Sequence, residues 1–377
     1  MQPRYEVADV LQEHWSNIEQ NQLGITIWQK RALSAIKRCR TLALGGHIDG
    51  CSSCGHLQIS YNSCRNRHCP KCQGHKREEW IQARERELLP VPYFHVVFTL
   101  PQGINPLALQ KPKLVYAILF KSAWQTIEAF SKDRKWVSAK MGMISILHTW
   151  GQQLSLHPHL HCIVPGGGVT RQGKWRTVKT QQGKFLFPVK AMSKTFRGKY
   201  CALLEKQAPK EYELIRYQLW KNPWVVYAKR PFGGPKQVVE YLGRYTHKIA
   251  ISNHRIEDMD RQTVTFSYKD YRQGAKKKQM TLTHREFIRR FSQHILPKRF
   301  VRIRHYGILS SAWKKQKLKD LQQDLEYIPI KTQTNTKKGQ CPCCKQYTLE
   351  IVCEFDARGP PIHWIKRLKK YKQKKPK

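Results

Sequence analysis

The chain has 377 residues, and its 69 lysines and arginines against 26 aspartates and glutamates give a formal net charge of +43 at pH 7. A positive field of this size exceeds what solubility requires, and it indicates a polyanionic partner, nucleic acid first. A membrane surface is disfavoured as the partner, because no long apolar span or amphipathic anchor accompanies the charge.

The N-terminal part of the chain indicates a helical module that binds zinc. Residues 1–15 lack the apolar core of a signal peptide, so we expect a cytoplasmic protein. Residues 7–40 repeat apolar side chains at helical spacing. Two Cys-x2-Cys knuckles follow, and each can present two thiolates to a tetrahedral metal ion. We therefore predict one structural Zn²⁺ held by four cysteines: Cys51, Cys54, Cys69 and Cys72.

The loop between the two knuckles leaves alternatives open. Cys64 and His68 lie within it, and either could replace one of the four cysteines. Basic side chains surround the site, and we expect DNA contacts from three of them: Arg65, Arg67 and Lys71. The module could equally be a rigid support for its neighbour. Three isolated cysteines are interpreted as small core residues: Cys39, Cys162 and Cys201.

The middle of the chain alternates predicted strands and helices. A charged helix is expected over residues 76–89 and a second helix over residues 107–130. The apolar run at residues 93–101 is rich in β-formers and ends at a proline, so we predict a strand. Further elements are predicted from the same patterns: a helix that opens after Pro188, a strand over residues 224–232 and a helix that restarts after Pro235.

Two strands joined by a turn are predicted over residues 141–164, and the second carries a His-x-His motif. Residues two apart on a strand point to the same face, so His159 and His161 project together while Leu160 faces the core. Two neutral imidazoles side by side suit a divalent metal ion. Taken alone, the motif could also be two chance histidines on a half-buried strand.

Two tyrosines are candidates for nucleophiles. Tyr241 and Tyr245 are spaced i, i+4, so a helix would put both hydroxyls on one face. A tyrosine with a pKa of about 10 becomes a useful nucleophile only if a metal polarises the target phosphate and cations stabilise the added charge. Arg244 and Lys248 are candidates for that cationic role and for DNA binding. The alternative is that both tyrosines pack in an amphipathic stripe.

The C-terminal part of the chain carries a second cysteine group. Residues 249–282 alternate as strands do, and residues 284–295 are helical in pattern. Cys341 and Cys344 form one knuckle, which Cys353 and His363 could complete as a zinc site. We expect the polybasic tail after residue 364 to be disordered and to contact phosphates.

Four long segments occur in an order typical of one family: NSCRNRHCPKC, HTWGQQLSLHPHLHCIVPGGG, FPVKAMSKTFRGKY and YLGRYTHKIAISNHRI. Together they resemble the zinc-binding two-tyrosine transposases of the insertion-sequence 91 type, which are prokaryotic rolling-circle enzymes of the HUH endonuclease superfamily. The resemblance implies a metal at His159 and His161, nucleophiles at Tyr241 and Tyr245, and zinc in the N-terminal module. It also implies a DNA-bound protein of the nucleoid.

A third metal ligand is usual in that superfamily, and several residues compete for the role. His148 lies on the preceding predicted strand, and an antiparallel hairpin would bring it against the pair, so it is preferred. His157 shares the face of the pair. The amides of Gln152 and Gln153 in the turn could also reach the metal.

The resemblance implies metal-assisted phosphoryl transfer. Mg²⁺ or Mn²⁺ would bind a scissile phosphate of single-stranded transposon-end DNA, and a tyrosine would form a covalent 5′-phosphotyrosine. We expect an α+β protein with a zinc-binding helical region at residues 1–90, an HUH-type domain with a central antiparallel sheet at residues 91–330, and a basic C-terminal tail at residues 331–377. Two alternatives remain: a replication initiator or relaxase with the same chemistry, and a non-enzymatic zinc-ribbon nucleic-acid binder.

Overall fold

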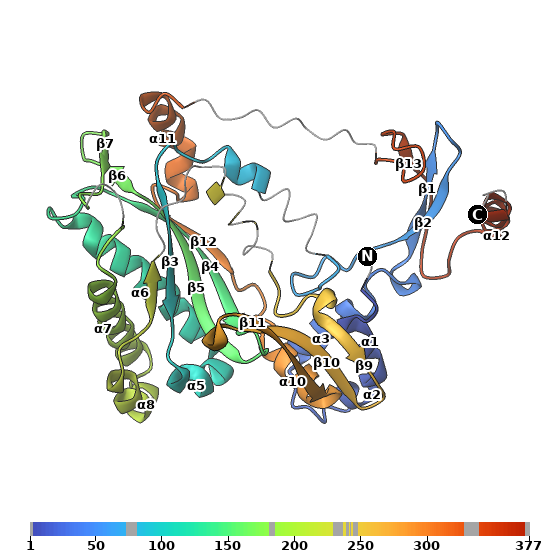
Figure 1. Cartoon of the computed structure of the whole chain (residues 1–377), viewed down its shortest axis with the longest axis horizontal. Coiled ribbons are helices and arrows are strands. Elements are labelled where there is room, and N and C mark those ends of the chain that lie inside the picture. The colour runs from blue at the N-terminus through green and yellow to red at the C-terminus, as the bar shows by residue number, and fades with distance from the viewer. Residues whose placement is uncertain are drawn as a thin grey trace. The chain divides into compact units, whose positions relative to one another are not determined.

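The computed structural model describes residues 3–72, 81–180, 185–228, 237–238, 241, 243, 248–327 and 339–373. The chain divides into two compact units (Figure 1). The terminal unit comprises Met1–His75, Ile251–Ser292 and Thr332–Lys377, and the central unit comprises Lys76–Ala250 and Gln293–Lys331. Among the described residues, no helix has the length and apolar character needed to cross a membrane.

This division differs from the three consecutive segments that the sequence suggested. Residues 251–292 pack with the N-terminal helices, where the backbone amide of Val7 donates to Oδ1 of Asn253 over 3.2 Å. The side-chain amide nitrogen of Gln29 donates to the backbone carbonyl of Ser292 over 2.9 Å. The expectation of a disordered tail after residue 364 is corrected, because α12 (Ile362–Gln373) includes residues 365–373. Strand β13 (Leu349–Phe355) precedes this helix.

The central unit is built on a five-stranded antiparallel sheet with the order β12-β4-β5-β3-β8. Its strands are β3 (Tyr93–Thr99), β4 (Gly142–Trp150), β5 (Leu156–Pro165), β8 (Val226–Ala228) and β12 (Ile303–Gly307). The predicted hairpin over residues 141–164 is confirmed as β4 and β5, and β5 occupies the middle of the sheet. A small hairpin, β6 (Gly167–Val169) and β7 (Trp175–Thr177), follows β5.

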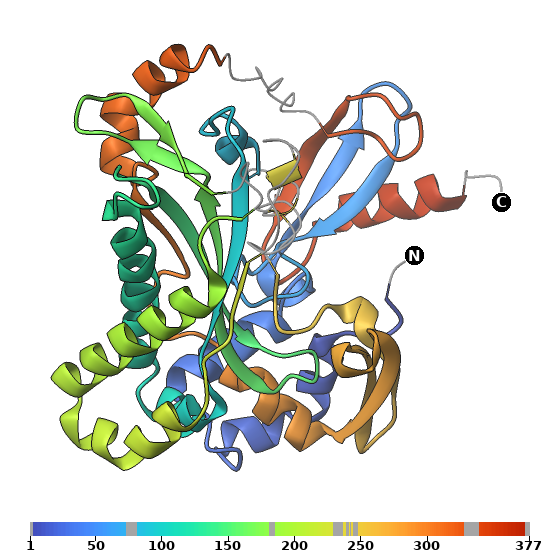
Figure 2. The same cartoon turned by 60° about the vertical axis from the view of Figure 1, so that its left-hand side comes forward.

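Strand alternation gives this sheet two different faces. Phe98 and Leu160 sit opposite each other and point into the main core, where Phe98 packs against Phe196 with ring centroids 4.9 Å apart. Helices cover this face, and Figure 2 shows them in green to yellow-green: α6 (Pro112–Lys132), α7 (Val189–Gln207) and α8 (Pro209–Lys221). Helix α7 begins directly after Pro188, as predicted.

The other face is part apolar and part histidine. At one end Ile144 and Ile163 pair and join a smaller core that includes Leu318 and Leu321 of α11 (Ser311–Asp324). Towards the other end the paired residues become His148 and His159. The same alternation that fills the core therefore lines up imidazoles on the opposite side of the sheet.

The terminal unit combines helices with two small antiparallel sheets. Helices α1 (Val7–Glu13), α2 (Trp15–Glu19) and α3 (Ile27–Lys37) come first, and Thr26 and Gln29 form a capping box at the start of α3. One sheet has the order β13-β1-β2, with β1 (Gly46–Cys51) and β2 (Leu57–Tyr61). The other comprises β9 (Ile256–Met259), β10 (Thr263–Asp270) and β11 (Lys276–Thr283), followed by α10 (His284–Gln293). The predicted α+β class with antiparallel sheets is confirmed.

Candidate functional site

Three histidines of the central unit converge on one face of the sheet. His148 on β4 sits directly opposite His159 on β5, and His161 follows two residues later on the same face. Their ligand nitrogens all lie within 4.8 Å of one another. The structure therefore brings the preferred third ligand, His148, against the His-x-His pair. The ring of His157 lies 5.1 Å from that of His159, but His157 is not part of this set.

A hydrogen-bonded chain connects this cluster to a tyrosine. The hydroxyl of Tyr241 lies 3.0 Å from Nδ1 of His95, and Nε2 of His95 lies 2.9 Å from Nδ1 of His161. Nε2 of His161 lies in turn 3.2 Å from Nε2 of His159. Nδ1 of His159 lies 2.7 Å from the backbone carbonyl of His157.

Simple donor and acceptor rules fix the proton positions at one end of this chain. The carbonyl of His157 can only accept, so Nδ1 of His159 carries the proton and its Nε2 presents a lone pair. The lone pair can accept a proton from Nε2 of His161 or point at a cation. The direction of the hydrogen bonds through His161 and His95 to Tyr241 therefore depends on whether this lone pair faces the N–H of His161 or a cation.

Burial keeps His159 and His161 neutral. Desolvation lowers the pKa of His159 to about 4, and repulsion from Lys248 contributes to the shift. The pKa of His161 lies well below its usual range, first because of burial and then because of the neighbouring histidines. Neutral imidazoles are the form that binds metals, so this donor set is ready for a cation at neutral pH.

Two predicted site residues, Tyr245 and Arg244, lie outside the described residues. Lys248 is described, and its side chain is exposed. Its charge is the last of the influences that lower the pKa of His159 and His161.

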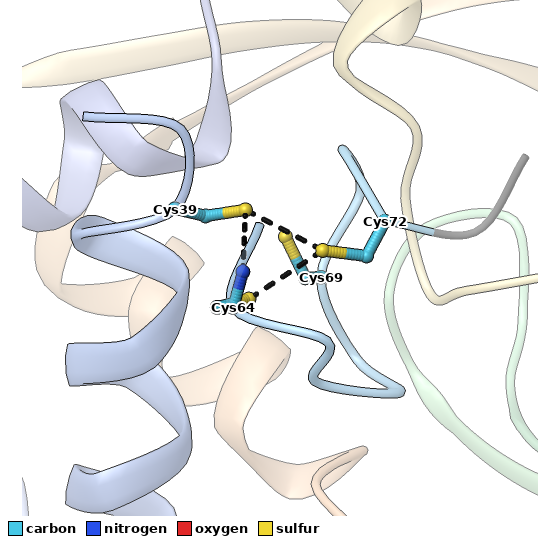
Figure 3. Close-up of side chains that lie close together, drawn as sticks. All are labelled: Cys39, Cys64, Cys69 and Cys72. Carbon is cyan, nitrogen blue, oxygen red and sulfur yellow. Dashed lines mark hydrogen bonds between the residues drawn. The ribbon is translucent and has the colours of Figure 1, made fainter. Parts of the chain in front are cut away.

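The cysteines of the terminal unit form a different group from the predicted one. Cys69 and Cys72 lie with Cys39 and Cys64, and their sulfur atoms are all within 4.8 Å of one another. Figure 3 shows the four side chains pointing toward a common centre, with Sγ of Cys72 lying 3.4 Å from Sγ of Cys39 and 3.6 Å from Sγ of Cys64. Hydrogen bonds from the neighbouring thiols lower the pKa of Cys39 well below its usual value, which favours a thiolate.

The predicted set of Cys51, Cys54, Cys69 and Cys72 is thereby corrected. Strands β1 and β2 carry the first knuckle away from the second, and the turn after α3 supplies Cys39 in its place. Cys39 is therefore not an isolated core residue. Cys64 does replace a cysteine of the first knuckle, as one of the alternatives allowed, whereas His68 is not in the group.

Comparison with known proteins identifies the family. A family model described as "Transposase zinc-binding domain" matches residues 10–100, and one described as "Putative transposase" matches residues 142–317. The "Putative transposase y4qJ" of Sinorhizobium fredii (strain NBRC 101917 / NGR234) is 41% identical over 392 residues, covering 95% of this chain and 98% of the relative. The chain belongs to the two-tyrosine transposases of the insertion-sequence 91 type.

A second relative supports the same assignment. The "Transposase for insertion sequence element IS801" of Pseudomonas savastanoi pv. phaseolicola is 29% identical over 303 residues, covering 76% of this chain and 72% of the relative. No solved structure matches the transposase. DNA is thus the substrate class, and the zinc-binding domain match together with the four-thiolate geometry at Cys39, Cys64, Cys69 and Cys72 indicates structural Zn²⁺.

The basic residues predicted to contact DNA occupy different environments in the transposase. Arg65 is exposed and lines a surface hollow beside Asn62, whereas burial lowers the pKa of Arg67. Lys71 pairs with Glu6 over 2.5 Å and donates to the carbonyl of Cys39 over 3.2 Å. These two contacts give Lys71 a structural role in holding the zinc module together.

Sequence reasoning missed His95, which bridges Tyr241 and His161. Its side chain is 3% exposed, and it interrupts the otherwise apolar run of β3. A polar ring inside a buried strand needs a partner, because an unpaired polar group in the core is costly. The histidine within an apolar run was therefore the sequence signal for a buried polar contact, although it did not identify the partner residue.

Proposed function

We propose that the transposase nicks and transfers single-stranded transposon-end DNA by a rolling-circle mechanism, through a covalent 5′-phosphotyrosine on Tyr241. The observation that supports this proposal is the hydrogen bond from the Tyr241 hydroxyl to His95, whose other nitrogen contacts His161. A tyrosine hydrogen-bonded in this way to histidines that could hold a metal ion supports a role in phosphoryl transfer rather than in packing alone.

The three clustered histidines fit a divalent cation. Two Nε2 atoms that lie 3.2 Å apart can share an ion with bonds of about 2.1 Å, a usual length for imidazole nitrogen. His148, His159 and His161 would hold the ion, which when bound would polarise the scissile phosphate and offset its charge. Of the expected Mg²⁺ and Mn²⁺, the nitrogen-rich donor set favours Mn²⁺, because Mg²⁺ prefers oxygen ligands.

Binding of a metal ion by His161 would change the direction of the hydrogen bonds that connect it to His95 and Tyr241. If Nε2 of His161 served as a ligand, its proton would sit on Nδ1, and this N–H would donate to Nε2 of His95. His95 must then carry its own proton on Nδ1 and donate it to the oxygen of Tyr241. A hydrogen bond received by this oxygen stabilises the negative charge that develops as the phenol loses its proton.

The chemistry then proceeds by direct displacement. After releasing its proton to solvent, the oxygen of Tyr241 attacks phosphorus. The bond from phosphorus to the 3′ oxygen breaks, and that oxygen takes up a proton from solvent to leave a 3′-hydroxyl. The phosphotyrosine preserves the phosphodiester energy, so a later attack by another 3′-hydroxyl restores the DNA backbone and frees the tyrosine. Lys248 would neutralise part of the phosphate charge. We propose Tyr245 as the nucleophile of the second transfer.

The test uses a single-stranded oligonucleotide of the transposon end, labelled at its 3′ end and incubated with the protein and Mn²⁺. Because the 5′ phosphate becomes linked to tyrosine, a labelled adduct should survive boiling in detergent. Tyr241→Phe should lower its yield, and Tyr241→Phe combined with Tyr245→Phe should abolish it. Tyr227→Phe is the matched control, since this tyrosine is exposed and lies on β8, in the same sheet as the histidine strands β4 and β5.

His159→Ala separates catalysis from binding. We expect cleavage to vanish while most DNA affinity remains, because lysine and arginine charges supply that affinity. An adduct of undiminished yield from the double phenylalanine variant would rule out both tyrosines. An equal loss of binding and cleavage in His159→Ala would point to a misfolded domain.

A further inference from the structure

The knuckle left out of the N-terminal zinc cluster has a partner elsewhere in the terminal unit. Cys51 ends β1 and Cys54 lies in the turn that leads to β2, whereas Cys341 and Cys344 lie at a turn before β13. Sγ of Cys51 lies 3.6 Å from Sγ of Cys344, although these residues are 293 positions apart in the sequence. Sγ of Cys54 lies 3.7 Å from Sγ of Cys341, and all four sulfur atoms lie within 4.8 Å of one another.

Strand pairing is what brings the two turns together. Strand β13 pairs with β1 in antiparallel register, from Gly46 opposite Phe355 to Cys51 opposite Leu349. Figure 1 shows the red β13 beside the blue β1 and β2. The second turn is itself closed by a bridge between Gly339 and Leu349. The sheet therefore holds two hairpin turns at the same end.

The two turns have the same backbone design. The amide of Cys51 donates to the carbonyl of His56, and the amide of Gly55 donates back to Cys51. In the second turn the amide of Cys341 donates to Gln346, and the amide of Lys345 donates back to Cys341.

The residue after the second cysteine of each turn also has the same left-handed conformation, with φ of 69° at Gly55 and 62° at Lys345. Lysine rarely adopts this conformation, so a local constraint is holding it there. A repeated turn of this kind, with the sulfurs of each pair facing those of the other, is what a shared tetrahedral ion requires.

We propose that Cys51, Cys54, Cys341 and Cys344 bind a second structural Zn²⁺, which forms a zinc ribbon from the two hairpins. Zinc–sulfur bonds of about 2.3 Å in a tetrahedron imply sulfur separations of about 3.8 Å, close to the two cross-hairpin distances above. The family model for the zinc-binding domain ends at residue 100, so it does not include the C-terminal pair. This site does not depend on the proposed catalytic mechanism.

Cys353, which the sequence analysis offered together with His363 to complete the C-terminal site, is not in this group. Cys353 is on β13 opposite Ile48, and its thiol contacts the carbonyl of Glu354. Cys343 is exposed between the two proposed ligands. Both residues therefore serve as internal controls, because they share the segment with the proposed ligands but are not in the four-sulfur group.

The ribbon also anchors the basic helix α12. His56, which follows the first knuckle, lies with Nδ1 2.9 Å from the hydroxyl of Tyr371 in α12. Their rings meet edge to face with centroids 5.5 Å apart. Among the side chains of this helix that the structure describes, four basic ones are exposed: Lys366, Arg367, Lys369 and Lys370.

The experiment measures zinc per full-length chain after purification in reducing buffer without chelator. We expect two ions for the native protein. Cys51→Ser with Cys54→Ser should leave one, and Cys341→Ser with Cys344→Ser should also leave one. Combining all four substitutions should still leave one, because both pairs share the same ion. Cys343→Ser with Cys353→Ser should retain two.

A measurement on the native chain makes the test independent of variant folding. Alkylation of the zinc-loaded protein should modify Cys343 but spare Cys341 and Cys344, and chelation should expose both to the reagent. The proposal is overturned if the native chain holds one ion, if the Cys341 and Cys344 variant keeps two, or if those two thiols react freely before chelation.

Discussion

The hydroxyl of Tyr241 and Nδ1 of His95 lie 3.0 Å apart, and the other nitrogen of the same ring contacts His161. One imidazole thus links the proposed nucleophile to a proposed metal ligand. Without a cation, Tyr241 can donate to His95, and each ring can donate to the next as far as the carbonyl of His157. Ligation of a cation at His161 would reverse the first two of these hydrogen bonds, so the proposed metal binding and nucleophile activation would be coupled through His95.

Two substitutions of His95 separate its two contacts. In His95→Asn the amide nitrogen can occupy the position of Nδ1 and still donate to Tyr241. In His95→Gln the amide reaches the position of Nε2 and still contacts His161. We expect each to slow adduct formation by roughly 10- to 100-fold, with Asn less damaging to the rate and Gln less damaging to Mn²⁺ affinity. Single-turnover adduct rates and Mn²⁺ titrations measure the two effects, and native values for both variants would remove His95 from the mechanism.

Metal preference follows from the donor set. Because the clustered ligands of the central unit are imidazoles, Mn²⁺ should support cleavage at a lower concentration than Mg²⁺. His148→Ala should raise the Mn²⁺ concentration needed for half-maximal cleavage by about 10-fold or more. Titration of each metal against adduct yield provides the measurement. Equal requirements in the native and His148→Ala proteins would show that this histidine is structural.

Lys248 should contribute one phosphate contact beside the histidines. Lys248→Gln is expected to weaken single-stranded DNA binding for all sequences and to reduce the slope of log affinity against log salt by about 1. Lys190→Gln on α7 is the matched control, because that helix covers the opposite face of the sheet. A Lys248→Gln protein with an unchanged salt slope would contradict this assignment.

Cys39 should behave as a zinc ligand rather than as a core residue. Cys39→Ser removes one thiolate from the N-terminal cluster, so the protein should lose one zinc ion and unfold at a lower temperature. Cys201→Ser is the control, since Cys201 is equally buried, lies on α7 and has no part in a metal cluster. Zinc analysis and thermal unfolding of both variants distinguish the roles, and full zinc content in Cys39→Ser would refute the assignment.

Acid should destabilise the central unit through His294. Burial lowers its pKa to about 4, and its ring contacts the hydroxyl of Thr149 and the carbonyl of Leu154. In the unfolded chain its pKa returns to about 6.5, so between these values the unfolded state binds the extra proton. The free energy of unfolding should be unaffected by this group above pH 6.5 and fall by about 3 kcal/mol as the pH drops to 4.

Urea unfolding at pH 7.5 and pH 5 tests this dependence. His294→Gln keeps an amide that can donate to Leu154 but does not titrate, so its stability should vary less with pH than that of the native protein. The same pH dependence in both proteins would mean that other groups, such as His305, govern the acid transition.

Local patterns in the sequence were sufficient for the histidine strand and insufficient for the cysteines. Period-two alternation put His159 and His161 on one face, and the short turn before them required an antiparallel partner that carries His148. Ligand grouping among the cysteines depends instead on how β13 pairs with β1, and no short-range pattern encodes that register. The spacing of the cysteines therefore predicted one zinc site from two Cys-x2-Cys knuckles that belong to different clusters in the structure.

The link between His95 and Tyr241 was hidden for a related reason. The two residues are 146 positions apart in the sequence. His95 also lies in an apolar run that is already explained as a buried strand, so nothing nearby pointed to Tyr241. Partners at such separations are set by packing across the whole unit. A buried histidine in an apolar strand indicates that a partner exists, but identifying it requires the three-dimensional structure.

The pairing of β1 with β13 has a consequence for biosynthesis. A ribosome makes residues 46–51 about 300 residues before their partner strand at residues 349–355 emerges. Until then β1 has an unpaired edge and two thiols without their partners, so the terminal unit should become resistant to protease only in chains that extend past residue 355. Limited proteolysis of stalled nascent chains of increasing length would reveal this step. A frameshift shortly before residue 349 would then disable the protein while leaving every proposed catalytic residue intact.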